Sequence, residues 1–424
     1  MSQPIGPAER GPTPLAERAL APDLARGAML LLIALANVRA FVDVPREGLR
    51  GYPDPATTTV LDDVVAAFQL VLVDGRAYPL FGLLFGYGVW QLASRRLDDG
   101  ASAATVVGIL RRRSVVLVGI GAAHGILFFP GEILAAYGLL LLLLPGAMVR
   151  AHDAALLAWA GIAGVLVVLL LAGSGSFGAV ADPIPAELGP AVREHLVDWP
   201  TGGVLSNAIG VSVTVPLGVL AARHRVLEQP AGHRALLVRC AAFGLGAAVV
   251  LGAWYALVAA GAVGPPSEGA APLMGLLHGA GGYAGGIGYA ALLGLVATRV
   301  AHNPEGGPAA PGPATQGLVT PGRTAARRPR GGALTTAISS LGRMSMSGYL
   351  LQTLVFVVVL VPWGPLALGR DITNLQAAGV AMGAWVLGLA VAAVLARGDR
   401  RGPFEALVRW WTYRGTAAGT RGPT

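Results

Sequence analysis

The sequence predicts an all-α protein: a polytopic bundle of about ten transmembrane helices with both termini in the cytoplasm. Of its 424 residues, 54% are hydrophobic and only 13% are charged, whereas a soluble domain normally carries about 25% charged residues. The apolar residues gather in ten runs, and a helix needs about 20 such residues to cross a bilayer. Arginines recur in every second connection between these runs. This composition excludes an ordinary soluble enzyme and, for most of the chain, intrinsic disorder.

The predicted spans follow one another closely. They lie near residues 27–42, 64–93, 114–129, 131–149, 154–172, 203–222, 235–262, 272–299, 341–362 and 375–396. The second begins as an amphipathic stretch, from Asp62 to Asp74, before its strongly apolar half. Pro130 and Gly131 form a tight turn between the third and fourth spans, as expected for antiparallel helices.

The arginines predict the orientation, because short cytoplasmic loops accumulate basic residues. Arg95 and Arg96 follow the second span and Arg150 follows the fourth, whereas the connections after the first and fifth spans are acidic or mixed. Ten spans satisfy all of these loops together. One alternative is that the first span is a cleaved signal peptide, which would leave nine spans and an external N-terminus.

Composition divides the chain into five parts. We predict a mobile N-terminal tail at 1–18, a membrane bundle of eight spans at 19–300, a disordered cytoplasmic linker at 301–332, the last two spans at 333–397, and a cytoplasmic basic tail at 398–424. In the linker, 13 of 32 residues are Pro or Gly, so it has too little apolar content to fold.

Several functions are excluded by residues that the sequence lacks. All 31 basic residues are arginine, and a P-loop ATPase needs a lysine on its phosphates. Cys240 is the single cysteine, so neither an internal disulfide nor a Cys-rich metal site is expected. Aromatic residues make up 6% and do not interleave with arginines, so we expect no nucleic-acid partner. The expected partner is the lipid bilayer.

His124 is the first candidate for chemistry, since polar groups inside a membrane are candidate sites. It lies in the outer half of the third span, and Glu132 begins the fourth just across the turn. A histidine with a carboxylate in reach is the minimal general-base pair. The alternative is that His124 makes an ordinary interhelical hydrogen bond while Glu132 caps the positive end of its helix.

The second candidate is the stretch from Asp74 to Tyr78 at the kink inside the second span. Arg76 could hold an anionic substrate group bidentately, with Tyr78 as a further substrate-binding residue. Alternatively, Asp74 and Arg76 pair only with each other.

Two further groups lie in the last and first parts of the bundle. Ser345, Tyr349 and Gln352 are spaced four and three apart, so they share one helix face and form a third candidate for substrate binding; packing between helices is the alternative. Arg26 lies three residues after Asp23, where an anchoring ion pair is expected. We predict that His124, Glu132, Arg76 and the face of Ser345 converge on one outward-facing cavity.

Four motifs, in the same order along the chain, resemble those of a known family. They read DLARG with Asn37, DGRAYPLFGLLFGYG, RRR…H…GEILAAYGLLLLLLP, and GRMSMSGYLLQTL followed by GPFEALVRWWTY. Together they extend over nearly the whole chain and resemble the bacterial YeiB-like membrane proteins, classed with the domain of unknown function 418. Glu132 replaces the usual Asp of that family and Gly348 the usual Asn, while Pro79 and Gly82 alter the second motif.

The resemblance implies a multi-pass protein of the bacterial plasma membrane. The family is distantly similar to transmembrane acyltransferases, which modify extracytoplasmic sugars and also carry an intramembrane histidine. By that likeness, His124 would activate an acceptor or carry the acyl group. Arg76 and Arg26 would lie near an acyl donor such as an acyl-CoA, and the acceptor would be a small molecule or a glycan. The rival hypotheses are a permease or exporter of a small solute, and a membrane scaffold without activity.

Overall fold

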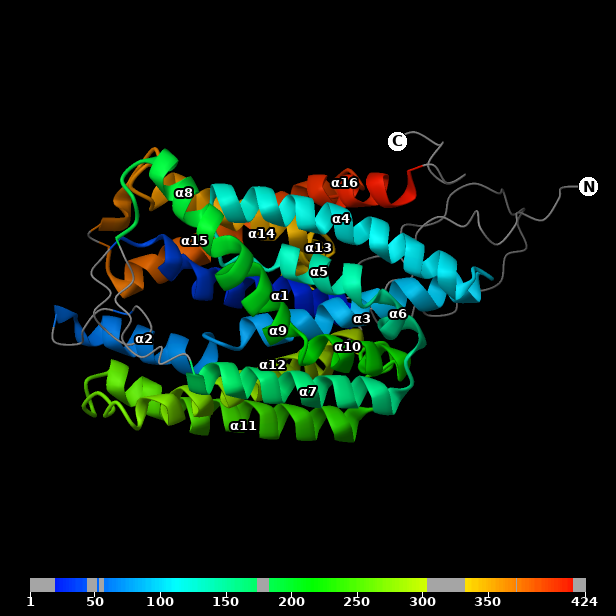
Figure 1. The fold of residues 1–424 in the computed structure, drawn as a ribbon, viewed down its shortest axis with the longest axis horizontal. Helices are drawn as coiled ribbons and strands as arrows, with labels where there is room; N and C mark the ends of the chain where they lie inside the picture. The colour runs from blue at the N-terminus through cyan, green and yellow to red at the C-terminus, as the bar shows by residue number, and fades with distance from the viewer. Residues whose placement is uncertain are drawn as a thin grey trace, which may run out of the picture.

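The computed structural model describes residues 20–43, 52, 57–173, 183–302, 332–370 and 372–414. The predicted tail at 1–18 and nearly all of the predicted linker at 301–332 lie outside these ranges. Within them, every regular element is a helix, as the sequence predicts. Figure 1 shows the long helices running side by side, roughly along the longest axis of the molecule.

The helices comprise long, membrane-length elements and shorter ones that connect or flank them. The first half contains α1 Leu20–Asn37, η3 Val38–Phe41, α2 Val60–Leu72, α3 Ala77–Asp98, α4 Ala103–Leu127, α5 Leu134–Leu143, α6 Pro145–Arg150 and α7 Asp153–Gly173. The second half contains α8 Leu188–Asp198, η6 Trp199–Leu205, α9 Ser206–Val211, α10 Thr214–Arg223, α11 Arg234–Ala259, α12 Ala271–His302, α13 Ala333–Arg343, α14 Ser345–Val359, η7 Leu368–Arg370, α15 Asn374–Arg397 and α16 Pro403–Tyr413.

Local sequence signals account for several helix ends. Thr59 caps α2 by accepting a hydrogen bond from the Asp62 amide, and Ser102 caps α4 in the same way. The joint between α2 and α3 contains Gly75 at a φ of 75°, a left-handed conformation that glycine adopts without a steric penalty. This joint is the kink that the sequence placed inside the second span.

Among the described residues, seven helical segments are long and apolar enough to cross a membrane, or eight if the pair α13–α14, bent by 91°, counts as one span. These eight correspond to eight of the ten predicted runs. The remaining two are α4 and α5: α4 carries Arg111–Arg113 within its length, and α5 has only 10 residues. The protein is therefore multi-pass, whereas a total of ten spans and the orientation of the termini stay predictions.

Small residues allow the helix axes to approach closely. Where α1 crosses α13, Gly27 and Gly342 each face the backbone of the other helix, and a methyl group on Gly342 would collide with the carbonyl oxygen of Asp23. In the pair α11–α12, Gly244 and Gly288 are similarly apposed. Close backbone packing of this kind is a principal source of helix association in lipid.

The outer surface of the bundle is apolar. Large hydrophobic side chains remain exposed along α7, α11 and α15, among them Ile162, Phe243, Val250 and Val394. On a soluble protein such a surface would be an interaction site or an aggregation hazard. On a membrane bundle it is the surface that faces the lipid chains.

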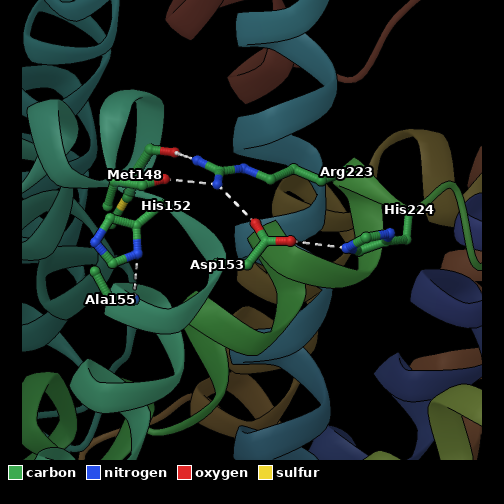
Figure 2. A network of polar contacts seen from close by, with 7 residues as sticks. Met148, His152, Asp153, Ala155, Arg223 and His224 are labelled. Atoms are coloured by element: carbon green, nitrogen blue, oxygen red, sulfur yellow. Dashed lines mark hydrogen bonds and ion pairs between the residues drawn. The ribbon is translucent and has the colours of Figure 1, made fainter.

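A polar network joins the start of α7 to the end of α10 (Figure 2). Arg223 donates to the Ala151 carbonyl at 2.6 Å and to the Asp153 carboxylate at 3.0 Å. His224 Nε2 lies 2.9 Å from the other oxygen of Asp153. Asp153 and His224 are about half exposed, so the network fixes a turn rather than forming a buried site.

Candidate functional site

His124 lies inside the bundle, on the face of α4 that meets α14. Its side chain is 4% exposed. Its Nε2 is 3.0 Å from the Thr353 hydroxyl of α14, and its ring lies 5.2 Å from the Tyr349 ring, edge to face. The other nitrogen, Nδ1, has no hydrogen-bond partner among the residues that the structure describes. One side of the imidazole is therefore held, while the other is left with its hydrogen-bonding capacity unused.

Glu132 is fully buried in the turn between α4 and α5. Its carboxylate accepts hydrogen bonds from the backbone amides of Leu134, at 2.6 Å, and Ala135, at 3.1 Å. It also accepts one from the indole of Trp199, at 3.1 Å. These contacts give Glu132 the capping function that was the alternative to a catalytic pair, because a carboxylate stabilises the positive end of a helix.

Glycine on α4 makes room for this carboxylate. A methyl group on Gly121 would lie 2.8 Å from Glu132 Oε1, and His124 is one turn further along the same helix face. The carboxylate and the imidazole thus both face the inner side of α4. The hydrogen bond that the structure shows for the imidazole goes to Thr353, not to Glu132.

Tyr137 on α5 belongs to the same place, although the sequence did not single it out. Its ring stacks on Phe85 with centroids 4.4 Å apart, and its buried hydroxyl has no hydrogen-bond partner in the described ranges. Tyr137 lies one helical turn after Leu134, whose backbone amide donates to Glu132. We call His124, Glu132, Tyr137, Tyr349 and Thr353 the His124 cluster. The tyrosine of GEILAAYG was the available signal for Tyr137.

The polar face predicted on α14 divides between two neighbours. Tyr349 faces His124, whereas Gln352 donates to the Leu30 carbonyl of α1 at 3.0 Å. Both side chains are buried. Ser345 is the first residue of α14 and is half-buried at the bend after α13. The face therefore contacts protein rather than lipid.

Arg76 lies in a second set of polar residues, at the joint of α2 and α3. It is 0% exposed. Its guanidinium donates to the Asp74 and Ala248 carbonyls, the latter at 2.9 Å, and one of its terminal nitrogens is 3.2 Å from His278 Nε2. Asp74 in turn accepts a hydrogen bond from the Tyr52 hydroxyl at 3.0 Å. His278 of α12, which the sequence analysis did not assign to a candidate site, is thus a neighbour of the buried arginine.

Arg39 extends this second set towards α15. Its guanidinium lies 5.0 Å from the centre of the Tyr52 ring and donates to the Asn374 side chain at 2.8 Å. We call Arg39, Tyr52, Asp74, Arg76 and His278 the Arg76 cluster. An intramembrane arginine is tolerated only when it is paired or hydrated, and this cluster provides such an environment.

The remaining candidates, Tyr78 and Arg26, lie elsewhere. Tyr78 packs edge to face on Tyr283, with centroids 5.6 Å apart. Arg26 lies 3.3 Å from the Asp23 carboxylate and donates to the Leu84 carbonyl of α3 at 3.3 Å, which is the expected anchoring pair. The structure thus joins His124 with Tyr349 and joins Arg76 with His278. Their convergence on a single cavity stays a prediction.

Comparison with known proteins gives family relatives without an assigned activity. The family model described as "Protein of unknown function (DUF418)" matches residues 221–325 and 317–415. An "Uncharacterized 39.9 kDa protein in amylase 3'region" of Bacillus acidopullulyticus is 34% identical over 134 residues, which is 31% of this chain and 35% of that protein. "Uncharacterized protein YeiB" of Escherichia coli strain K12 is 34% identical over 126 residues, or 29% of each chain. The alignments thus span about a third of these relatives.

Proposed function

This chain belongs to the DUF418 family and is a multi-pass helical membrane protein, and from that premise we propose that it transfers an acyl group to an extracytoplasmic acceptor, with His124 as the base. The observation that carries the proposal is the asymmetric environment of the imidazole. Thr353 holds Nε2 at 3.0 Å, while the buried Nδ1 has no partner among the described residues. A histidine oriented in this way is prepared to take a proton on its second nitrogen.

The proposed reaction uses a thioester donor, such as an acyl-CoA, and an acceptor with a hydroxyl or amine. His124 Nδ1 takes the proton of the acceptor group while that group attacks the acyl carbon. A bond between acceptor and acyl group forms, the carbon–sulfur bond of the donor breaks, and the thiolate leaves. The Thr353 hydroxyl would accept a hydrogen bond from Nε2–H and so fix the tautomer that leaves Nδ1 basic.

Tyr137 and Glu132 have supporting roles in this proposal. The Tyr137 hydroxyl, buried without a partner in the described ranges, would donate to the carbonyl oxygen as negative charge develops on it. Glu132 holds the start of α5 and would position Tyr137 rather than touch the substrate. The acceptor would arrive from outside the cell, because the arginine alternation predicts an external turn at Pro130.

The experiment compares a deletion strain with strains that carry the wild-type chain or His124→Gln. Mass spectrometry of surface glycans and lipids should show an acylated species that the wild type restores. His124→Gln should lower its amount by about a hundredfold or more, the usual contribution of a general base. His224→Gln, in the half-exposed network of Figure 2, is the matched control and should restore the species fully. Full restoration by His124→Gln, at equal protein level, would refute the proposal.

A permease is the second candidate, and the Arg76 cluster is the observation that favours it. Arg76 and His278 are almost completely buried within candidate membrane spans, where ionisable residues often mark a substrate or ion pathway. Transport predicts solute uptake into proteoliposomes that a protonophore abolishes. It also predicts that Arg76→Gln stops uptake while His124→Gln leaves it unchanged, which is the opposite of the ranking expected for acyl transfer.

A further inference from the structure

The C-terminal helix α16 carries large apolar side chains on its outward side, where a helix on a soluble protein carries polar ones. Its inward side includes Glu405, Val408 and Thr412, and its outward side carries Leu407, Trp410 and Trp411. A surface helix in water turns its apolar stripe to the core and its charges to solvent. The environment on the outer side of α16 is therefore unlike water.

The inward side is fixed by Glu405. Its carboxylate accepts hydrogen bonds from the backbone amides of Met346, at 2.9 Å, and Ser347, at 3.1 Å, which are in the first turn of α14. It also accepts one from the Ser347 hydroxyl. A carboxylate at this position stabilises the positive end of α14. Figure 1 shows α16 lying along α4, on the flank of the bundle, and α16 also contacts α14.

The outward side combines large apolar groups with arginine. Trp410 is 55% exposed, and Trp411 and Leu407 are also exposed. The guanidinium of Arg414 lies 5.2 Å from the Trp410 ring and 5.8 Å from the Trp411 ring. At the other end of the helix, Arg400 and Arg401 are exposed. Tryptophan favours the level of the lipid headgroups, and arginine attracts anionic lipids.

We propose that α16 is a juxtamembrane helix, running alongside α4, whose outer side meets the membrane interface and binds anionic phospholipid headgroups through Trp410, Trp411 and Arg414. With 11 residues it is too short to span the bilayer, but its exposed apolar side chains can lie among the headgroups and upper acyl chains. The charge argues for anionic lipid, because Glu405 is turned inward to α14 while Arg400, Arg401 and Arg414 are exposed near the two ends of the helix. The proposal is independent of acyl transfer.

A lipid surface accounts for the exposed apolar and basic side chains of α16 better than a second copy of the chain or bulk water does. Along the flank of the bundle, α16 is continuous with the apolar outer surface, where Val115 of α4 is also exposed. Arg96 at the end of α3 lies 5.0 Å from the Tyr413 ring. This places α16 next to the arginine-rich end of the spans, where interfacial basic residues gather. A second copy of the chain and bulk water are the alternatives that the experiment separates.

The experiment measures the depth of α16 in the intact protein. Trp410→Cys is made in a Cys240→Ser background, labelled with an environment-sensitive fluorophore, and placed in nanodiscs of phosphatidylcholine with or without phosphatidylglycerol. We expect strong quenching by a nitroxide on the upper acyl chain and weak quenching by iodide in water. Gly232→Cys, in an exposed loop between α10 and α11, is the control and should give the opposite pattern.

The lipid preference is measured with the same label. Phosphatidylglycerol should increase nitroxide quenching at position 410, and Arg414→Gln should reduce that preference about fivefold, the effect of one basic residue at an anionic surface. Arg225→Gln, in the same exposed loop as Gly232, should not change it. Iodide quenching at 410 equal to that at 232 would refute the interfacial position. If protection from iodide is lost when each nanodisc holds a single copy, the surface contacts a second chain instead of lipid. Equal nitroxide quenching in both lipid mixtures would refute the preference for anionic headgroups.

Discussion

Gly27 and Gly342 set the distance between α1 and α13. A side-chain methyl on Gly27 would collide with the Ile338 carbonyl, and one on Gly342 with the Asp23 carbonyl. Because these obstacles are backbone atoms, the helices themselves would have to separate. We predict that Gly342→Ala destabilises the protein by about 1–3 kcal/mol, as overpacking typically does. The loss should appear as a lower thermal unfolding midpoint in detergent.

Gly379→Ala is the matched control for this prediction. Gly379 is on the exposed side of α15, and no atom lies within 4 Å of the position that a methyl group would take. Alanine is the better helix former by about 1 kcal/mol, so this variant should be as stable as the wild type or more so. A similar loss for both variants would show that close packing at Gly342 is not the cause.

For single residues, the prediction of which polar side chains are buried was more accurate than the prediction of what those side chains contact. His124, Glu132, Arg76, Tyr349 and Gln352 are all buried, as expected for polar groups in membrane-length helices. The partner of His124 could not be found, because Thr353 is 229 residues away and threonine is common in such helices. His278 was left aside for the same reason: its neighbour Arg76 is 202 residues away.

At the scale of the element, α14 depends on a residue from another helix. Its first amides are satisfied by Glu405 of α16, and α14 carries Tyr349 and Thr353 of the His124 cluster. We predict that Glu405→Ala destabilises the protein by about 1 kcal/mol, the usual effect of losing a helix cap. It should also speed hydrogen exchange at the amides of Met346 and Ser347, measured by mass spectrometry.

Glu268→Ala serves as the control, since Glu268 is exposed in the loop before α12. It should leave both the unfolding midpoint and the exchange of the α14 amides unchanged. If Glu405→Ala also leaves that exchange unchanged, water replaces the carboxylate fully and α14 does not depend on α16.

The sequence predicted long apolar helices and missed the short ones. The segment 398–424 was predicted as a cytoplasmic basic tail with no helix assigned to it, and residues 403–413 of this segment form α16. The reason is that the partners of Glu405 lie 58 and 59 residues earlier, and local composition alone indicates a solvated segment. The bend of 91° between α13 and α14 was missed as well. Gly342 and Ser345 flank the break at Met344, but glycine and serine are also common in membrane helices that do not break.

At the scale of the whole molecule, α4 and α5 decide how many times the chain crosses the membrane. With 25 residues and a rise of 1.5 Å per residue, α4 is about 37 Å long, enough to cross. The arginines at 111–113 would then lie towards its cytoplasmic side. Because this hairpin adds either two crossings or none, the connections after it lie on the same side in both cases.

We predict ten crossings, with the turn at Gly131 outside the cell. Gly131→Cys in the Cys240→Ser background should react with an impermeant maleimide added to intact cells, because Gly131 is exposed. Reporter fusions at Gly189 should be external, and those at Gly312 and the C-terminus cytoplasmic, as the arginine alternation requires. A label at 131 that appears only after the cells are opened would reduce the count to eight.

The position of Arg76 also sets an order of events during synthesis. Its contacts on α11 and α12 come from Ala248 and His278, which are 172 and 202 residues later in the chain. The second span therefore leaves the ribosome well before the helices that enclose its guanidinium. Until α12 is made, this charge must stay in water or in the insertion machinery, because lipid would not accept it. The first half of the protein thus completes its insertion only when the second half arrives.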